Sequence, residues 1–272
     1  MPDEVMHDLT GKTAIVIGAG QSPGEGMGNG RASALLYARH GARVLAVDMD
    51  MKRAADTVAQ ITESGGVAQA SQADVTDEAS LESAISACND LWGSVDILHN
   101  NVGVSLAGGD APVTEITEQA FDNVVAINLR GTVMACKHAL PIMREQQSGV
   151  IINISSIAAS NNYPLVTYKA TKYAMIAFTQ QLAIQNAEYG IRANVILPGL
   201  LNTPMAVDTR ARVWGRSRAD VAAERDAKVP LRHKMGTAWD VANAALFLVS
   251  DEANFITGVS LPVDGGTSVR VG

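Results

Sequence analysis

Short runs of apolar and β-branched residues alternate with longer stretches of helical periodicity along the 272 residues of the chain. Most of these runs are almost wholly apolar, which is typical of strands buried on both faces. Strands are predicted at residues 13–17, 43–48, 67–72, 95–100, 150–155, 192–197 and 259–264, and helices near residues 31–40, 51–64, 78–92, 118–146, 167–189 and 238–250. This strict alternation predicts an α/β fold: a doubly wound, Rossmann-like parallel sheet of seven strands with helices on both faces.

The predicted strands use the whole length, so residues 1–272 are expected to form a single domain without linkers or short repeats. Residues 204–237 are the exception to the alternating pattern. They are charged, rich in Arg, and fall between the sixth strand and the last helix. We call residues 204–237 the lid segment, because an excursion of this kind is expected to cover a substrate.

Charge and composition exclude several classes of protein. The net charge of −7 argues against nucleic acid or an anionic membrane as a partner. The first ten residues do not resemble a signal peptide, and no apolar run approaches the ~18 residues of a membrane span. Cys88 and Cys136 show no metal-like or redox spacing, and His99, His138 and His233 share no acidic cluster. We therefore expect a cytoplasmic protein with reduced cysteines and no metal site.

A glycine-rich turn follows the first predicted strand and precedes an Ala-rich amphipathic helix. Its glycines stand at positions 18, 20, 24, 26, 28 and 30. Glycines leave backbone N–H groups free to face a pyrophosphate at the start of the helix. Because the strand, turn and helix occur together, the motif predicts a dinucleotide-binding site.

Asp48 ends the second predicted strand and lies 20 residues beyond Gly28. A carboxylate at this position can accept hydrogen bonds from both ribose hydroxyls of NAD, and it would repel the 2′-phosphate of NADP. The residues that follow, Met49 and Asp50, include no Arg that could bind such a phosphate. The predicted cofactor is therefore NAD.

Tyr168 and Lys172 stand four residues apart in the sequence YKATK. On a helix this spacing puts both side chains on one face. A free Tyr titrates near ~10, and a neighbouring cation stabilises the phenolate and lowers its pKa. Ser156 lies twelve residues upstream, at the end of an apolar strand. These residue types are suited to moving the proton of an alcohol.

Further short motifs occur in a fixed order along the chain: the glycine turn, ADV at 73–75, NNVG at 100–103, Asn128 in INLRG, ISS at 154–156, YKATK, LPG at 197–199 with Thr203, and VDGG near the end. In this order they closely resemble those of the short-chain dehydrogenase/reductase family. The resemblance extends from Lys12 to Gly266. It implies a Rossmann-like fold, a nicotinamide cofactor and hydride transfer between an alcohol and a ketone.

The resemblance implies a role for each matching residue. Tyr168 would be the general acid/base, and Lys172 would lower its pKa and hold the nicotinamide ribose. Ser156 would hydrogen-bond the substrate oxygen, and Asn128 would kink its helix and hold a water that links Lys172 to solvent. The implied cofactor-binding residues are Gly18, Gly28, Asn29, Gly30, Asp48, Asp74, Val75, Asn101, Val102, Gly103, Tyr168, Lys172, Pro198, Gly199, Leu201 and Thr203.

The chain departs from the family pattern in three places. The glycine turn carries about six extra residues. Its last two family glycines are therefore Gly28 and Gly30 if the helix keeps its length, or Gly26 and Gly28 if an apolar residue must separate them. Val102 replaces the usual Ala beside the cofactor. The spacing from Ser156 to Tyr168 is one residue short, so Ser155 stays open as an alternative, although Ser156 keeps the motif alignment.

Five arginines between residues 210 and 225 of the lid segment could attract an acidic substrate. Asp and Glu residues are interspersed among them, and a solvated, salt-bridged helix surface is the favoured interpretation. The arginines are Arg210, Arg212, Arg216, Arg218 and Arg225, and the acidic residues are Asp208, Asp220, Glu224 and Asp226.

The predicted function is an NAD-dependent oxidoreductase that interconverts a secondary alcohol and a ketone. One alternative is an NADPH-dependent 3-ketoacyl-type reductase, against which Asp48 argues. Another is a catalytically silent NAD-binding regulatory protein, against which the complete set of catalytic candidates argues. The small-molecule substrate is not named by the sequence: cyclic or aromatic alcohols, dihydrodiols and hydroxysteroids are all candidates.

Two long predicted helices, 118–146 and 167–189, carry apolar residues on more than one face. A helix that covers only one sheet needs a single apolar stripe. The second stripe predicts a partner across a two-fold axis, so we expect a homotetramer, with a dimer as the fallback. The alternative is that the lid segment of the same chain covers these residues.

Overall fold

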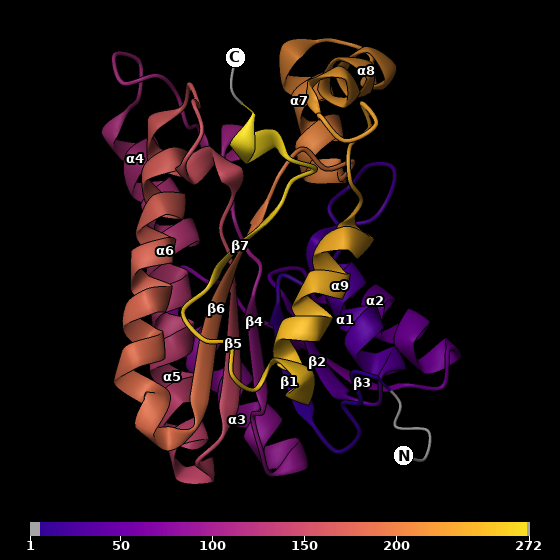
Figure 1. Cartoon of the computed structure of the whole chain (residues 1–272), viewed down its shortest axis with the longest axis vertical. Helices are drawn as coiled ribbons and strands as arrows, with labels where there is room; N and C mark the ends of the chain where they lie inside the picture. The colour runs from indigo at the N-terminus through magenta and orange to yellow at the C-terminus, as the bar shows by residue number, and fades with distance from the viewer. Residues whose placement is uncertain (1–5, 271–272) are drawn as a thin grey trace.

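Seven parallel strands form one sheet at the centre of the computed structural model, which describes residues 6–270 (Figure 1). The strands are β1 (Thr13–Ile17), β2 (Arg43–Asp48), β3 (Val67–Gln72), β4 (Ile97–Asn100), β5 (Gly149–Ile154), β6 (Ile191–Pro198) and β7 (Ser260–Val263). Their order in the sheet is β3-β2-β1-β4-β5-β6-β7, and every neighbouring pair is parallel. The predicted fold class is confirmed, and every predicted strand is present within two residues of its expected ends.

Helices cover both faces of the sheet. They are α1 (Asn29–Arg39), α2 (Met51–Glu63), α3 (Glu78–Trp92), α4 (Glu118–Val125), α5 (Gly131–Gln146), α6 (Val166–Asn186), α7 (Thr209–Trp214), α8 (Arg218–Lys228) and α9 (Ala238–Val249). One apolar core lies between the sheet and helices α1 and α9, and the other between the sheet and helices α3, α5 and α6. Neighbouring residues of one strand contribute to both apolar cores: Ile151 and Ile152 of β5 point to opposite faces of the sheet, and both are buried. Polar and apolar positions therefore do not alternate along the central strands.

The predicted helix 118–146 is interrupted. A single π-helical turn, Ala126–Arg130, separates α4 from α5 and contains Asn128. π-helical turns inside helices frequently occur at functional sites, because they re-aim one side chain. The interruption leaves no break in the apolar periodicity, so the pattern predicted one helix where the structure has two.

The lid segment rises beyond the carboxyl ends of the strands and carries helices α7 and α8 (Figure 1). It has a small apolar core of its own, built from Val207, Val221, Val229 and Met235. Arg218 Nε lies 3.3 Å from Asp208 Oδ1 and 3.5 Å from Glu25 Oε2. Because Glu25 belongs to the extra residues of the glycine turn, this insertion is packed against the lid segment.

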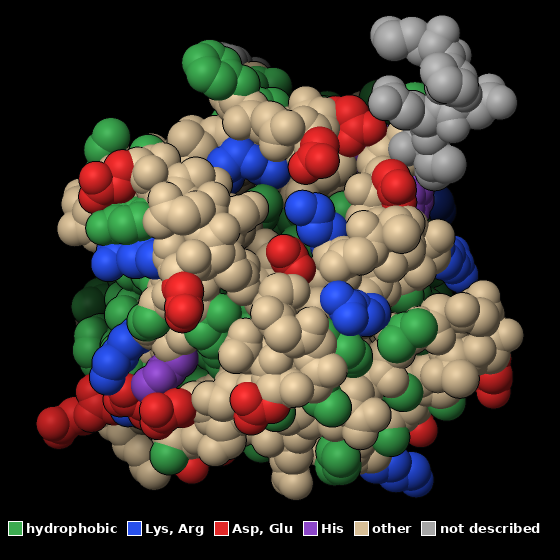
Figure 2. Space-filling model, turned by 90° about the horizontal axis from the view of Figure 1, so that it is seen from below, with side chains coloured by type: hydrophobic (Ala, Val, Ile, Leu, Met, Phe, Trp, Pro, Cys, Tyr) green, Lys and Arg blue, Asp and Glu red, His purple; other side chains and the backbone are tan. Residues whose placement is uncertain are grey.

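The opposite end of the molecule, seen in Figure 2, has interspersed acidic and basic side chains rather than a field of one sign. Within residues 6–270, no helix combines the length and the apolar character that crossing a membrane requires.

Candidate active site

Tyr168 and Lys172 lie on the same face of α6, as their spacing predicts. The Lys172 Nζ is 5.7 Å from the centre of the Tyr168 ring. Only 2% of Lys172 is exposed, and its ammonium donates a 2.7 Å hydrogen bond to the carbonyl oxygen of Ile154 at the end of β5. The helix and the neighbouring strand end therefore hold both side chains in place.

Burial disfavours the ionised form of both side chains, the phenolate of Tyr168 and the ammonium of Lys172. It raises the pKa of Tyr168 to about 12 and lowers the pKa of Lys172 to about 8. Ser156 lowers the pKa of Tyr168 through a hydrogen bond, and Arg210 and Arg225 lower it through their charges. The Lys172 ammonium donates to the Ile154 carbonyl, and its role in lowering the pKa of Tyr168 stays a prediction.

The two adjacent serines have different surroundings. Ser156 caps the short helical turn Ile157–Ala159, where its Oγ accepts a 3.1 Å hydrogen bond from Ala158 N, and it also lies beside the Tyr168 phenol. Ser155 is 2% exposed and donates a 2.6 Å hydrogen bond to the carbonyl oxygen of Lys172. Ser156 therefore lies next to the phenol, whereas the side chain of Ser155 holds α6 against β5.

Asn128 is fully buried in the π-helical turn. Its amide forms two hydrogen bonds with the backbone of Val104, of 2.7 Å to the nitrogen and 2.9 Å to the oxygen. Gly103 connects it to the tyrosine–lysine pair: a Cβ on Gly103 would lie 3.0 Å from Lys172 Nζ and 3.5 Å from Asn128 Oδ1. All four predicted catalytic residues thus converge at the carboxyl ends of β4 and β5.

Asp110 is a site residue that sequence reasoning missed. Its carboxylate accepts hydrogen bonds from Thr167 N at 3.0 Å and from Tyr168 N at 2.9 Å, and only 5% of it is exposed. Leu165 occupies the cap position of α6 and has no polar side chain, so Asp110 satisfies the first N–H groups of this helix instead. A cap from 57 residues upstream leaves no local signal in the sequence.

A buried polar chain beneath the site was also missed. Asn100 of β4 donates to Asn153 of β5, and Asn153 donates to Thr179 of α6, both at 2.9 Å. All three side chains are buried and satisfied, which ties two strands to the helix that carries Tyr168.

The glycine turn lies at the end of β1. Gly18 has a φ of +85°, which glycine adopts without strain. A Cβ on Gly30 would overlap the carbonyl oxygen of Gly18, so only glycine lets α1 pack this closely against β1. Gly28 directly precedes α1. This packing supports the alignment in which Gly28 and Gly30 are the last two family glycines.

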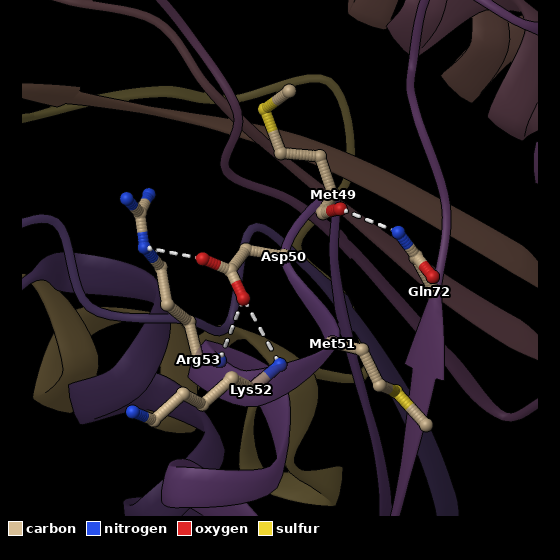
Figure 3. A pocket seen from close by; sticks show the side chains of 6 residues that line it. All are labelled: Met49, Asp50, Met51, Lys52, Arg53 and Gln72. Carbon is tan, nitrogen blue, oxygen red and sulfur yellow. Dashed lines mark hydrogen bonds and ion pairs between the residues drawn. The ribbon is translucent and has the colours of Figure 1, made fainter.

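Asp48 lies where β2 ends, beside the glycine turn. Its carboxylate accepts hydrogen bonds of 3.0 Å from Gly20 N and from Asp50 N. An open depression lies next to it, lined by Met49, Asp50, Met51, Lys52, Arg53 and Gln72 (Figure 3). In this view Arg53 points toward Asp50, with 3.2 Å between Nε and Oδ2. The guanidinium of Arg53 is therefore already paired with a carboxylate.

The other predicted cofactor residues surround the same edge of the sheet. Asn101 Nδ2 donates to Gly18 O at 3.1 Å, and Val102 packs against Gly18. Thr203 caps the turn that opens the lid segment, and Leu201 is buried beside it. Asp74, Val75, Pro198 and Gly199 also stand at the ends of strands or in the turns that follow them, and Asn29 is the first residue of α1.

These residues fit a nicotinamide dinucleotide. From β1 the chain continues to β2 and β3 on one side of β1, and it then crosses to β4 on the other side. Such a switch point is where parallel sheets bind nucleotides. The glycine turn leaves the start of α1 open, and Asn29 Oδ1 there has no hydrogen-bond partner among the described residues. Within residues 6–270 no three His, Cys, Asp or Glu side chains cluster as metal ligands would.

Comparison with known proteins gives consistent results. The family model described as Enoyl-(Acyl carrier protein) reductase matches residues 24–268. The chain is 35% identical, over 97% of its length and 98% of the relative, to the 2,5-dichloro-2,5-cyclohexadiene-1,4-diol dehydrogenase of Sphingobium indicum. The crystal structure of levodione reductase superposes with a TM-score of 0.89 and 31% identity, over 96% of this chain and 99% of that one.

A crystal structure from Burkholderia xenovorans, described as a short-chain dehydrogenase/reductase, is 39% identical with a TM-score of 0.87, over 97% of this chain and 99% of that one. Both the sequence and the fold therefore match across nearly the whole chain. The chain belongs to the short-chain dehydrogenase/reductase family, whose members are oxidoreductases that use a nicotinamide cofactor.

Proposed function

We propose that this protein is an NAD-dependent oxidoreductase that interconverts a secondary alcohol and a ketone. The observation that carries the proposal is the Tyr168 phenol, with Ser156 beside it and Lys172 behind it on the same helix face. Relatives that are named as a diol dehydrogenase and as a reductase support this reaction type.

The residues divide the chemistry among them. Tyr168 takes the proton of the alcohol hydroxyl or returns it to the ketone oxygen, and Ser156 donates a hydrogen bond to the same oxygen as its charge changes. A bound nicotinamide ring supplies the hydride acceptor or donor. Lys172 holds its ammonium beside Gly103, where it can hydrogen-bond the ribose next to that ring. Asn128 and Asp110 keep the surrounding loop and helix in position.

The experiment that tests this function is reduction of NAD by a panel of cyclic, aromatic and aliphatic secondary alcohols. We expect turnover of at least one alcohol by the wild type. A 3-ketoacyl-type reductase would instead oxidise NADPH with a ketoacyl thioester and leave the alcohols untouched. A silent regulatory protein would bind NAD, as measured by calorimetry, and turn over nothing.

Asp48 should set the preference for NAD over NADP. Replacing it with Ala removes the charge that repels a 2′-phosphate, so the ratio of the two dissociation constants should shrink by about tenfold or more. Calorimetric titration of both cofactors measures this ratio. The matched control is Glu63→Ala, which removes an exposed carboxylate at the far end of α2. Equal affinity of the wild type for NAD and NADP would contradict the assignment.

The two serines should respond differently to substitution. Ser156→Ala removes the hydroxyl beside the phenol and should lower kcat by about tenfold to a thousandfold. Ser155→Ala removes a bond to the α6 backbone and should lower the melting temperature more than kcat. Steady-state kinetics and thermal unfolding separate the two effects. A larger loss of kcat in Ser155→Ala would move the catalytic role to that residue.

We also propose that the protein assembles as a homotetramer, with a dimer as the fallback. Large apolar side chains are exposed on the helices of one face: 62% of Tyr173 and 73% of Ile184 on α6, and 45% of Phe121 on α4. Helices α7 and α8 of the lid segment stand elsewhere and do not cover α6 (Figure 1). Light scattering should give four times the 28.5 kDa of one chain, and a mass of one chain would reject assembly.

A further inference from the structure

Arg210 of α7 points toward the tyrosine pair at the site rather than into solvent. Its Nη2 donates a 3.4 Å hydrogen bond to the phenolic oxygen of Tyr163. The ring of Tyr163 lies 5.5 Å from the ring of Tyr168, and its oxygen is 3.1 Å from Ser105 Oγ. A polar chain thus runs from the lid segment through Tyr163 to Ser105, and the ring of Tyr163 packs beside the predicted catalytic Tyr168.

Arg225 of α8 faces the same region. Its Nε is buried and has no hydrogen-bond partner among the described residues. Burial and the charge of Arg210 lower the pKa of Arg225 to about 10, while Tyr163 and Tyr168 act in the opposite direction. Two guanidinium groups therefore lie close enough to repel each other, and both lie near Tyr163 and Tyr168.

Four other basic residues of the lid segment pair with carboxylates, as expected from their sequence, whereas Arg212 and Arg232 are exposed and are not among them. Arg216 and Lys228 both pair with Glu224, at 2.7 and 2.6 Å, and Arg218 lies 3.3 Å from Asp208. Lys234 pairs with Asp226 at 2.9 Å. The expectation of a salt-bridged surface is thus right for these side chains.

Arg210 and Arg225 depart from that expectation. No carboxylate among residues 6–270 forms an ion pair with either of them. Partly buried like charges are unfavourable without an opposite charge or a full set of acceptors. The part of the lid segment near Tyr163 therefore contains two positive charges and one buried N–H group, Arg225 Nε, that an anion would complete.

We propose that Arg210 and Arg225 bind a carboxylate group of the substrate, so that the preferred substrates are hydroxy acids and their keto acids. The inference rests on the proposed function, because it takes Tyr168 as the site of reaction. A planar guanidinium matches a carboxylate with paired hydrogen bonds, and the two arginines approach from separate helices of the lid segment. Binding of the carboxylate would also draw α7 and α8 toward the phenol.

The test compares acids with their neutral esters. Levulinate and 4-oxocyclohexanecarboxylate are each paired with the methyl ester, and reduction is followed by loss of NADH absorbance. We expect the wild type to prefer each acid in kcat/KM by about tenfold to a hundredfold. Arg225→Met and Arg210→Met should bring the ratio of kcat/KM for acid over ester close to one, and they should also lower turnover of the esters, because both charges lower the pKa of Tyr168. Arg225→Lys should retain part of the preference.

The control is Arg212→Met, which removes an exposed arginine from the same helix as Arg210. This variant should leave kcat/KM unchanged for both the acid and the ester. Thermal unfolding checks that each variant folds. If Arg225→Met does not fold, Arg210→Met still tests the inference. A preference for acids that all three Met variants retain would overturn the inference.

Binding of levulinate to the enzyme–NADH complex, measured by calorimetry, needs no turnover. It should be detectable for the acid and at least tenfold weaker for the methyl ester and for Arg225→Met. Equal binding of acid and ester, or none of either, overturns the inference. A wild type that reduces neutral ketones alone overturns the inference and supports the proposed function, whereas one that reduces no ketone and oxidises no alcohol contradicts the proposed function.

Discussion

Replacing Tyr168 with Phe should lower kcat by about 10²- to 10⁴-fold while NAD binding stays nearly unchanged. The substitution removes only the hydroxyl that carries the proton and keeps the ring that packs against Tyr163. Because the loss falls on the reaction step, kcat and kcat/KM should decline together. Steady-state kinetics and calorimetric titration with NAD measure the two quantities.

The matched control is Tyr173→Phe, which removes an exposed hydroxyl from the same helix. It should retain wild-type turnover. Near-normal kcat in Tyr168→Phe would show that another group moves the proton, and the roles assigned around this phenol would have to be reassigned.

Lys172→Met should have opposite effects on function and on stability. Turnover and cofactor affinity should both fall, because the ammonium beside Gly103 is lost. The cofactor-free protein should nevertheless become more stable near pH 7, by about 1–3 kcal/mol. Burial lowers the pKa of Lys172 from 10.5 to about 8, so the charged form is penalised in the folded state. The bond to Ile154 offsets part of this penalty.

The sign of the pH dependence follows from that pKa. Between about pH 8 and pH 10.5 the unfolded chain holds the Lys172 proton and the folded chain has lost it, so wild-type stability gains with rising pH. The advantage of Lys172→Met should therefore be full below pH 8 and should shrink through this window. Denaturant unfolding at a series of pH values measures it.

The neighbouring Lys169 provides the contrast. Its ammonium donates to the carbonyl oxygens of Ala158, Ala159 and Asn161, at 3.1, 3.1 and 2.6 Å. Lys169→Met should therefore destabilise the protein. If both variants were destabilised equally, the buried ammonium of Lys172 would be a structural tie rather than a charge retained for function.

Much of this structure could be predicted from local pattern alone. Buried parallel strands read as continuous apolar runs, and Tyr168 and Lys172 share a helix face by spacing. The π-helical turn at Asn128 was expected only as a kink, because periodicity does not register a single inserted residue. The unchanged helix length already favoured Gly28 and Gly30 from the sequence, and the close approach of α1 to Gly18 supports that alignment.

Residues that act over long sequence distances could not be predicted. Asp110 caps a helix that begins far downstream, and nothing near Asp110 in the sequence indicates it. The lid arginines all look alike in sequence, since charged residues of both signs surround each of them. Only the fold separates Arg216, which pairs with Glu224, from Arg225, whose buried Nε has no partner among the described residues.

Transfer of deuterium from the carbinol carbon tests the central claim most directly. The protein is incubated with NAD and the best alcohol of the panel, labelled with deuterium at its carbinol carbon, and the reduced cofactor is examined by NMR. The account predicts one deuterium on the nicotinamide ring of each NADH formed, and almost none formed by Tyr168→Phe. NADH without deuterium, or no NADH from any alcohol, would contradict it.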